Sequence, residues 1–265
     1  GILPALPMVF PPLWILSWIA PAPVFAVSFL APPVKKHPLR RAYGRGLSFF
    51  YCWGLVVFYW FMELYPLDFA GLDKWGSLAV ILVAWFGLPL LQAVFSAFVF
   101  LFIHMLSVKY KARGRSLILS LAAASLWIFF EWIQTLTWAG VPWGKLALTQ
   151  TGWLPLIQSA SLLGSYAVSF LIIFCASLLG CALLHWNRHL LRRAAALSTA
   201  ALCVLGGNLA YGLLRCSLYQ PKGEPVTVAA VQGNINSSEK WDDKTNSTLD
   251  VHETLTLAAV ADGAD

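Results

Sequence analysis

The sequence is short of charged side chains. Asp, Glu, Lys and Arg together make up 11% of its 265 residues, whereas apolar residues make up 59%. Soluble domains carry about a quarter charged residues, so this chain cannot cover a water-facing globule. Its 13 Trp, 17 Phe and 8 Tyr lie in long apolar runs, which excludes a disordered or collagen-like chain. With a mean hydropathy of +0.70, the composition predicts a membrane protein.

Acidic residues are especially scarce before residue 217. Residues 1–216 hold 15 of the 18 basic residues and 4 of the 12 acids, whereas residues 217–265 hold 3 basic residues and 8 acids. The charge pattern therefore predicts two domains, a membrane domain of residues 1–216 and a differently solvated tail of residues 217–265. The basic residues fall in short clusters between apolar runs, which is typical of membrane loops, and no nucleic-acid partner is expected.

Cysteine motifs are also missing. The sequence has no C-x-x-C pair, and its five cysteines lie within apolar runs or, for Cys216, at the end of one. These positions favour small buried residues over disulfides or ligands, and we expect no metal site and no cofactor. The chain opens on Gly1 without a Met or a basic region, which is typical of a cut end and not of a signal peptide.

Six stretches are long and apolar enough to cross a membrane of roughly 30 Å. Pro89 is expected to kink the third stretch, which is longer than an upright helix requires. The six are Val9–Leu30, Gly46–Leu67, Ser77–Leu106, Leu117–Trp138, Leu156–His185 and Ala194–Arg215.

The connections between these stretches alternate in basic residues, with counts of five, one, four, one and three. Cytoplasmic loops are enriched in Lys and Arg. The pattern places the first, third and fifth connections in the cytoplasm, and the tail on the outer side. It also supports a single crossing by each stretch.

Glu131 and Glu63 are the carboxylates within the predicted spans. Glu131 lies about 21 Å along its helix from Leu117, toward the outer side, and Glu63 lies near the outer end of its own span. An intramembrane carboxylate indicates a functional site, but a helix-packing hydrogen bond explains Glu131 equally well. Several tryptophans, including Trp143, also fall at outer helix ends. They form either an aromatic belt or the mouth of a lipid-accessible cleft.

The tail has a different pattern. Pro225–Val231 is a β-branched run that predicts a buried strand, and Thr245–Ala261 predicts a helix that stops at Gly263. Strand, loop and helix begin an α/β domain. One strand and one helix cannot bury a core, so we expect the folded domain to continue beyond Asp265.

Several short motifs, taken together in their order, resemble the apolipoprotein N-acyltransferase family. They are Glu131-Trp132, Gly140-x-Pro142-Trp143, Gln150, Gly164-x-Tyr166-x-Val168-Ser169-Phe170-Leu171, Val231-Gln232-Gly233-Asn234-Ile235 and Lys240-Trp241-Asp242. The resemblance implies a multi-pass protein of the bacterial inner membrane with a periplasmic nitrilase-like domain. It also implies transfer of an acyl chain from a phospholipid donor to the N-terminal cysteine amine of a diacylated lipoprotein, through a thioester.

The resemblance further implies where the chemistry lies. The catalytic Glu, Lys and Cys of the family are expected beyond Asp265, and no cysteine of this chain matches the nucleophile. Trp241 matches a position in the active-site region, although packing of its loop is an alternative. Trp241, Trp143 and Glu131 are therefore the candidate lipid-binding residues. The chain is expected to be a fragment, truncated at both ends, that does not catalyse alone.

Two other functions suit a protein with six spans and two intramembrane carboxylates. One is a transporter or channel subunit, although the halves show no internal repeat and no matched broken helices. The other is a non-catalytic membrane scaffold whose tail docks a partner.

Overall fold

The computed structural model describes residues 1–29, 37–109, 115–136, 142–219, 223–224, 226–235 and 245–264. Within these ranges the chain forms α-helices and short 3-10 helices, and no residue is assigned to a β-strand. The contacts divide the chain into two units. The first comprises Gly1–Tyr59 and Phe86–Tyr219, and the second comprises Trp60–Trp85 and Gln220–Asp265.

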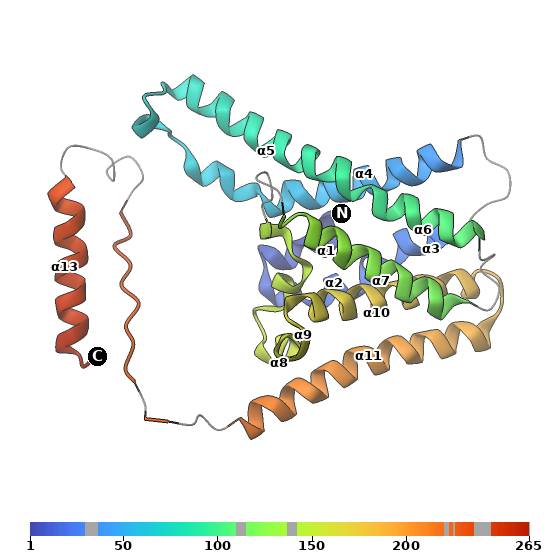
Figure 1. Ribbon diagram of the computed structural model, residues 1–265. Coiled ribbons are helices and arrows are strands. Elements are labelled where there is room, and N and C mark those ends of the chain that lie inside the picture. The colour runs from blue at the N-terminus through green and yellow to red at the C-terminus, as the bar shows by residue number, and fades with distance from the viewer. Residues whose placement is uncertain are drawn as a thin grey trace. The chain divides into compact units, whose positions relative to one another are not determined.

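Long helices dominate the first unit (Figure 1), and short turns connect several of them. The α-helices that lie wholly or partly in it are α1 (Ile2–Ala5), α2 (Ile15–Ile19), α3 (Ala22–Phe29), α4 (Pro38–Val57), α5 (Lys74–Ser96), α6 (Phe98–Lys109), α7 (Ser116–Ile133), α8 (Leu154–Ile157), α9 (Ala160–Leu163), α10 (Ser165–Trp186) and α11 (Leu191–Leu218).

Five helical stretches within the described residues are long and apolar enough to cross a membrane, so the chain is a multi-pass helical membrane protein. They are Pro11–Phe29, Lys74–Lys109, Ser116–Ile133, Ser165–Trp186 and Leu191–Leu218. Each overlaps one of the six predicted stretches, which confirms those five.

The remaining predicted stretch, Gly46–Leu67, is wrong in its bounds. The helix here is α4, which begins eight residues earlier and ends at Val57, and a 3-10 helix, η3 (Tyr59–Leu64), follows it. The 20 residues of α4 extend over about 30 Å. Arg40, Arg41 and Arg45 lie in its first eight residues, so α4 is less apolar than the five candidate spans.

Helix α10 forms the centre of the first unit, where it packs against α3, α7 and α11. Most of its side chains are buried. Gly180 permits a close approach to α3, because a Cβ atom at this position would lie 2.8 Å from the backbone oxygen of Ala22 and 2.8 Å from Cβ of Phe25. Burial on several sides explains why α10 is apolar around its whole circumference.

Two predicted stretches are interrupted. Leu156–His185 is divided among α8, α9 and α10, and Gly164, with φ 72°, separates α9 from α10. Such a φ is easily adopted by glycine, which lacks a Cβ atom. In the third stretch Pro89 lies inside α5, and the helical run breaks later, between Ser96 and Phe98.

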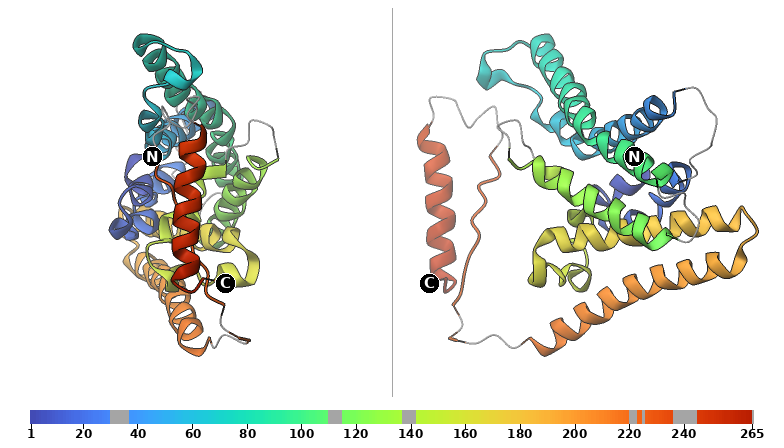
Figure 2. Two further views of the ribbon diagram at one scale, coloured as in Figure 1. Left: turned by 90° about the vertical axis from the view of Figure 1, so that its left-hand side faces the viewer. Right: turned by 45° about the vertical axis from the view of Figure 1, so that its right-hand side comes forward.

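The three connections rich in basic residues join helix ends at the same end of the first unit. These ends are those of α3 and α4, α6 and α7, and α10 and α11, and they lie at the right of Figure 1 and of the right-hand view in Figure 2. The C-terminal ends of α4 and α7, together with α8 and α9, lie at the opposite end. This arrangement agrees with the alternation of basic residues along the sequence.

The second unit contains η4 (Asp68–Ala70), the first half of α5, and α13 (Thr245–Ala261). The bounds of α13 confirm the helix predicted in the tail. It ends as expected, with Gly263 in a left-handed conformation at φ 93°. The strand predicted at Pro225–Val231 is not found, because residues 226–235 form neither helix nor strand. A strand needs a neighbouring strand for its backbone hydrogen bonds, and Val228 here is 83% exposed.

Candidate functional site

Glu131 lies near the C-terminal end of α7, where its side chain is only 7% exposed. Its Oε1 atom accepts a hydrogen bond of 2.7 Å from the backbone N–H of Leu146. The same atom accepts a bond of 3.3 Å from Nε1 of Trp127, one helical turn earlier. The carboxylate therefore fastens the end of α7 to the segment that begins at Leu146.

This segment, residues 142–150, will be called the anchored segment. It contains two 3-10 helices, η5 (Pro142–Gly144) and η6 (Leu146–Gln150). Helix α10 holds it at two further points. The backbone N–H of Ala147 donates to Oγ of Ser169 over 3.1 Å, and Nζ of Lys145 lies 4.5 Å from the centre of the Tyr166 ring.

Gln150 fixes the far end of the anchored segment to the N-terminal region. Its side chain is fully buried. The Oε1 atom accepts a bond of 2.9 Å from Nε1 of Trp18, and Nε2 donates to the backbone oxygen of Trp14 over 3.2 Å and to Oγ1 of Thr149 over 2.7 Å. The anchored segment is thus tied to α2 as well as to α7 and α10.

The N-terminal part of the anchored segment lies against α4. The Trp143 ring is half exposed and lies 6.2 Å, centre to centre, from the ring of Phe58, which follows the last residue of α4. A Cβ atom on Gly144 would lie 3.2 Å from Nε1 of Trp53. One side of the Trp143 ring is therefore exposed, while the backbone that carries it packs closely against α4.

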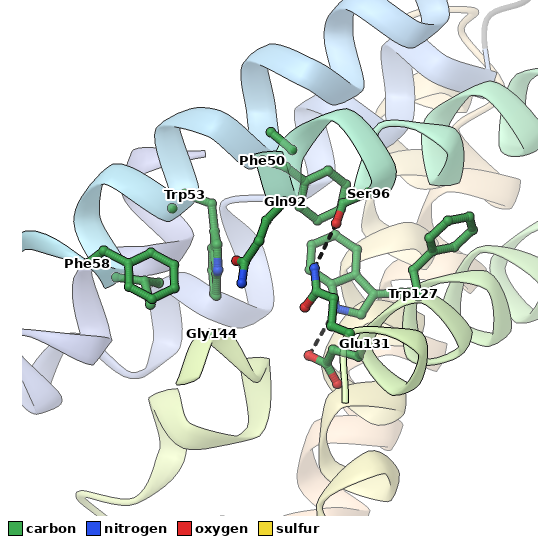
Figure 3. Close-up of a pocket in the computed structure, with 13 residues that line it drawn as sticks. Phe50, Trp53, Phe58, Gln92, Ser96, Trp127, Glu131 and Gly144 are labelled. Carbon is green, nitrogen blue, oxygen red and sulfur yellow. Dashed lines mark hydrogen bonds between the residues drawn. The ribbon is translucent and has the colours of Figure 1, made fainter. Parts of the chain in front are cut away.

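A small pocket adjoins Glu131 (Figure 3). It lies between α4, α5, α7 and Gly144, and has a volume of about 30 Å³, which exceeds the roughly 10–15 Å³ that a water molecule needs. Aromatic rings of Phe50, Trp53 and Trp127 line it beside polar side chains. Among the polar groups, Nε2 of Gln134 donates to Oγ of Ser96 over 2.8 Å. Oε2 of Glu131 has no hydrogen-bond partner among the described residues.

The structure brings together two of the three predicted site residues. Glu131 binds Leu146, three residues after Trp143, so Glu131 contacts the anchored segment that contains Trp143. Trp241 lies outside the described residues. Glu63 lies exposed on η3. The sequence did not single out Trp14 and Trp18, the partners of Gln150, although their position in an apolar N-terminal stretch placed them in a span.

The cysteines offer no second site. All five are free and lie in helices: Cys52 in α4, Cys175 and Cys181 in α10, and Cys203 and Cys216 in α11. In the part of the chain that the structure describes, no three His, Cys, Asp or Glu residues lie close enough together to hold a metal ion.

Comparison with known proteins gives the family. The model of the apolipoprotein N-acyltransferase N-terminal domain matches residues 1–178. The chain belongs to the apolipoprotein N-acyltransferase family. Residues Glu131, Gln150, Tyr166 and Ser169, which surround or form part of the anchored segment, all lie within the matched region.

Individual relatives agree with the family assignment, and each is named as an apolipoprotein N-acyltransferase. A protein of Geobacter metallireducens is 31% identical over 99% of this chain and 47% of its own length. One of Allorhizobium ampelinum is 32% identical over 85% of this chain and 41% of its own, and one of Nitrosomonas europaea is 33% identical over 44% and 22%. The chain thus spans less than half the length of these relatives. No solved structure matches it.

Proposed function

We propose that this chain supplies the membrane base of an N-acyltransferase that takes part in lipoprotein maturation. The reaction would move an acyl chain from a phospholipid to the N-terminal cysteine amine of a diacylated lipoprotein. The family match over residues 1–178 carries this proposal. The convergence of the motif residues on the anchored segment supports it, since it gives those residues a common structural role.

The proposal includes an orientation in the bacterial inner membrane. The end of the first unit that is rich in Lys and Arg would face the cytoplasm, by the enrichment of these residues in cytoplasmic loops. The anchored segment would then lie near the outer surface, where a lipoprotein substrate is anchored. Residues 1–216 would form the membrane domain, and residues 217–265 would begin a periplasmic nitrilase-like domain.

The nucleophile would not lie within these 265 residues. A thioester requires an activated thiolate with a base beside it, and the five cysteines here lie in helices, four of them in candidate spans. We expect the Glu, Lys and Cys of the reaction beyond Asp265. Residues 1–265 mixed with a phospholipid donor should therefore form no acyl adduct that hydroxylamine cleaves, and an adduct on Cys216 would contradict this placement.

Within the membrane base we assign different roles to the two described candidates. Glu131 would be a positioning residue, because its bonded oxygen holds the anchored segment. Trp143, whose ring is half exposed beside Phe58, would contact the acyl chain or the lipid anchor of the substrate. Trp241 would contact substrate from the soluble domain.

The test is acyl transfer from phospholipid to a diacylated lipopeptide, measured on the full-length protein that we propose contains this chain. Trp143→Ala should lower the rate at least tenfold, because a displacement of about 1 Å can cost roughly a hundredfold. Trp241→Ala should lower it further, and Trp143→Phe should restore part of the activity. Trp75→Ala is the matched control, because Trp75 is a 78% exposed ring at the start of α5. Full activity of both the Trp143 and Trp241 variants would refute the assignment.

A further inference from the structure

A second hollow lies at the opposite end of the first unit from the anchored segment. It is an apolar groove of about 460 Å³ between the α2–α3 region, α10 and α11, and we call it the α10–α11 groove. Ile19, Leu179, Leu183, Leu191 and Ala195 are among the residues that line it. The volume lies within the range of about 300–1,000 Å³ that is usual for small-molecule sites.

The chain between and just after two residues that line the groove, Trp186 and Leu191, is strongly basic. Arg188 lies in the connection between α10 and α11, and Arg192 and Arg193 lie in the first turn of α11; all three are exposed. Arg188 and Arg193 interact electrostatically with His185 in the last turn of α10, so their charges lie close to the end of that helix. No acidic residue occurs between Glu131 and Glu224 in the sequence, so neither α10 nor α11 carries an acidic residue.

The position of these arginines favours an anion nearby. The first turn of a helix carries the positive end of the helix dipole, which disfavours cations there. Two arginines in the first turn of α11, with no acidic residue in that turn, raise the positive potential further. Trp186, which is 64% exposed and also lines the groove, has the amphipathic ring that is typical of residues at the level of lipid headgroups.

We infer that the α10–α11 groove binds an anionic phospholipid, with one acyl chain in the groove and the headgroup phosphate against Arg192 and Arg193. An apolar groove with three arginines close in the sequence to its lining residues Trp186 and Leu191 fits the two chemical parts of such a lipid. By the proposed orientation the lipid would come from the cytoplasmic leaflet. This site goes beyond the proposed acyl transfer, since it lies at the end of the first unit away from Glu131 and Trp143.

The direct test is lipid binding by the full chain in detergent, measured by native mass spectrometry with equimolar dioleoyl-phosphatidylglycerol and dioleoyl-phosphatidylcholine. The first bound lipid should be phosphatidylglycerol, with at least fivefold tighter binding than phosphatidylcholine. A fivefold preference corresponds to about 1 kcal/mol, the usual contribution of one Lys or Arg to the attraction of anionic lipid. Equal binding of the two lipids by the unmodified chain would by itself overturn the inference.

Two matched pairs of variants locate the binding. The double variant Arg192→Gln/Arg193→Gln should lose most of the preference, whereas Arg40→Gln/Arg41→Gln removes the same charge from the start of α4 and should keep it. Ala195→Phe fills the groove and should weaken binding of the first lipid at least fivefold. Ala196→Phe, which places the same ring on an exposed neighbour that does not line the groove, should not.

Each departure from these results has a defined meaning. An equal loss in the Arg40 and Arg192 pairs would show a general surface potential and refute a site at the α10–α11 groove. If Ala195→Phe left the affinity for the first bound lipid unchanged, the acyl chain would not occupy the groove. This result would also refute the inference. Because the readout is lipid binding, it is independent of acyl transfer, and failure of the proposed function would leave it unchanged.

Discussion

The bond between Glu131 and the backbone of Leu146 can be tested with Glu131→Ala. This substitution should destabilise the otherwise unchanged chain but stabilise a variant that carries Leu146→Pro. Glu131→Ala removes the acceptor and leaves the buried N–H of Leu146 without a partner. A hydrogen bond to a charged group contributes about 1.5–3 kcal/mol, and an unsatisfied buried donor costs a comparable amount. We expect a loss of about 3 kcal/mol in the free energy of unfolding. Glu131→Gln keeps an oxygen at this position and should cost about 1 kcal/mol.

The second substitution of a double-mutant cycle with Glu131→Ala is Leu146→Pro. Proline has no N–H, and its ring carbon would occupy the space in front of Oε1 of Glu131, which lies 2.7 Å from the nitrogen. The backbone otherwise suits proline, because Leu146 is the first residue of η6 and Lys145 before it is extended, with φ −62° and ψ 128°. Leu146→Pro should therefore be strongly destabilising alone, and Glu131→Ala should partly rescue it.

The assay is reversible unfolding of the purified chain in mixed micelles by increasing sodium dodecyl sulfate, followed by tryptophan fluorescence. Glu63→Ala is the control, because Glu63 is an exposed carboxylate on η3, and it should change stability by less than about 0.5 kcal/mol. The coupling energy in the cycle should exceed about 1 kcal/mol. Equal effects of Glu131→Ala in both backgrounds would show that the bond to Leu146 does not contribute.

Two further predictions follow from individual contacts, and a third follows from the distribution of basic residues. Gln150→Leu should cost about 2 kcal/mol in stability and shift the tryptophan emission, since it removes the acceptor of the buried Trp18 indole; an unchanged spectrum would argue against this bond. Gly180→Val should destabilise the chain by about 1–3 kcal/mol by forcing α10 away from α3, and wild-type stability would contradict the close packing. In a cysteine-free background in intact cells, Lys74→Cys should react with a membrane-impermeant maleimide and Arg188→Cys should not; the reverse pattern would refute the proposed orientation.

The sequence predicted well those features that depend on local composition. Helix α13 agrees with its predicted bounds because its apolar residues and its terminal Gly263 give a complete local signal. The positions of five membrane helices followed from apolar length alone. The start of α4 was missed because its first eight residues contain Arg40, Arg41 and Arg45. A hydropathy pattern locates an apolar segment, whereas the backbone hydrogen bonds of a helix can continue into a charged end.

Other features depended on interactions that local composition does not encode. The predicted strand at Pro225–Val231 requires a partner strand, and none is present among the described residues. The interruption at Gly164 was hidden within an apolar stretch, because the apolar character of Leu156–His185 continues across it. Apolar residues suit both a buried turn and a buried helix, so hydropathy cannot distinguish them.

The anchored segment shows most clearly where prediction from the sequence ends. Its own residues have no helical periodicity, and it is held by Glu131 before it, Ser169 after it and Trp18 more than a hundred positions earlier. The motifs identified Glu131 and Gln150 as residues of interest but left open whether the carboxylate has a site role or a packing role. The geometry shows the packing bond, because one carboxylate oxygen binds the segment that carries Trp143, and the site role stays a prediction. Any effect of Glu131 on acyl transfer would then act through the position of Trp143, so Glu131→Gln should retain more activity than Glu131→Ala.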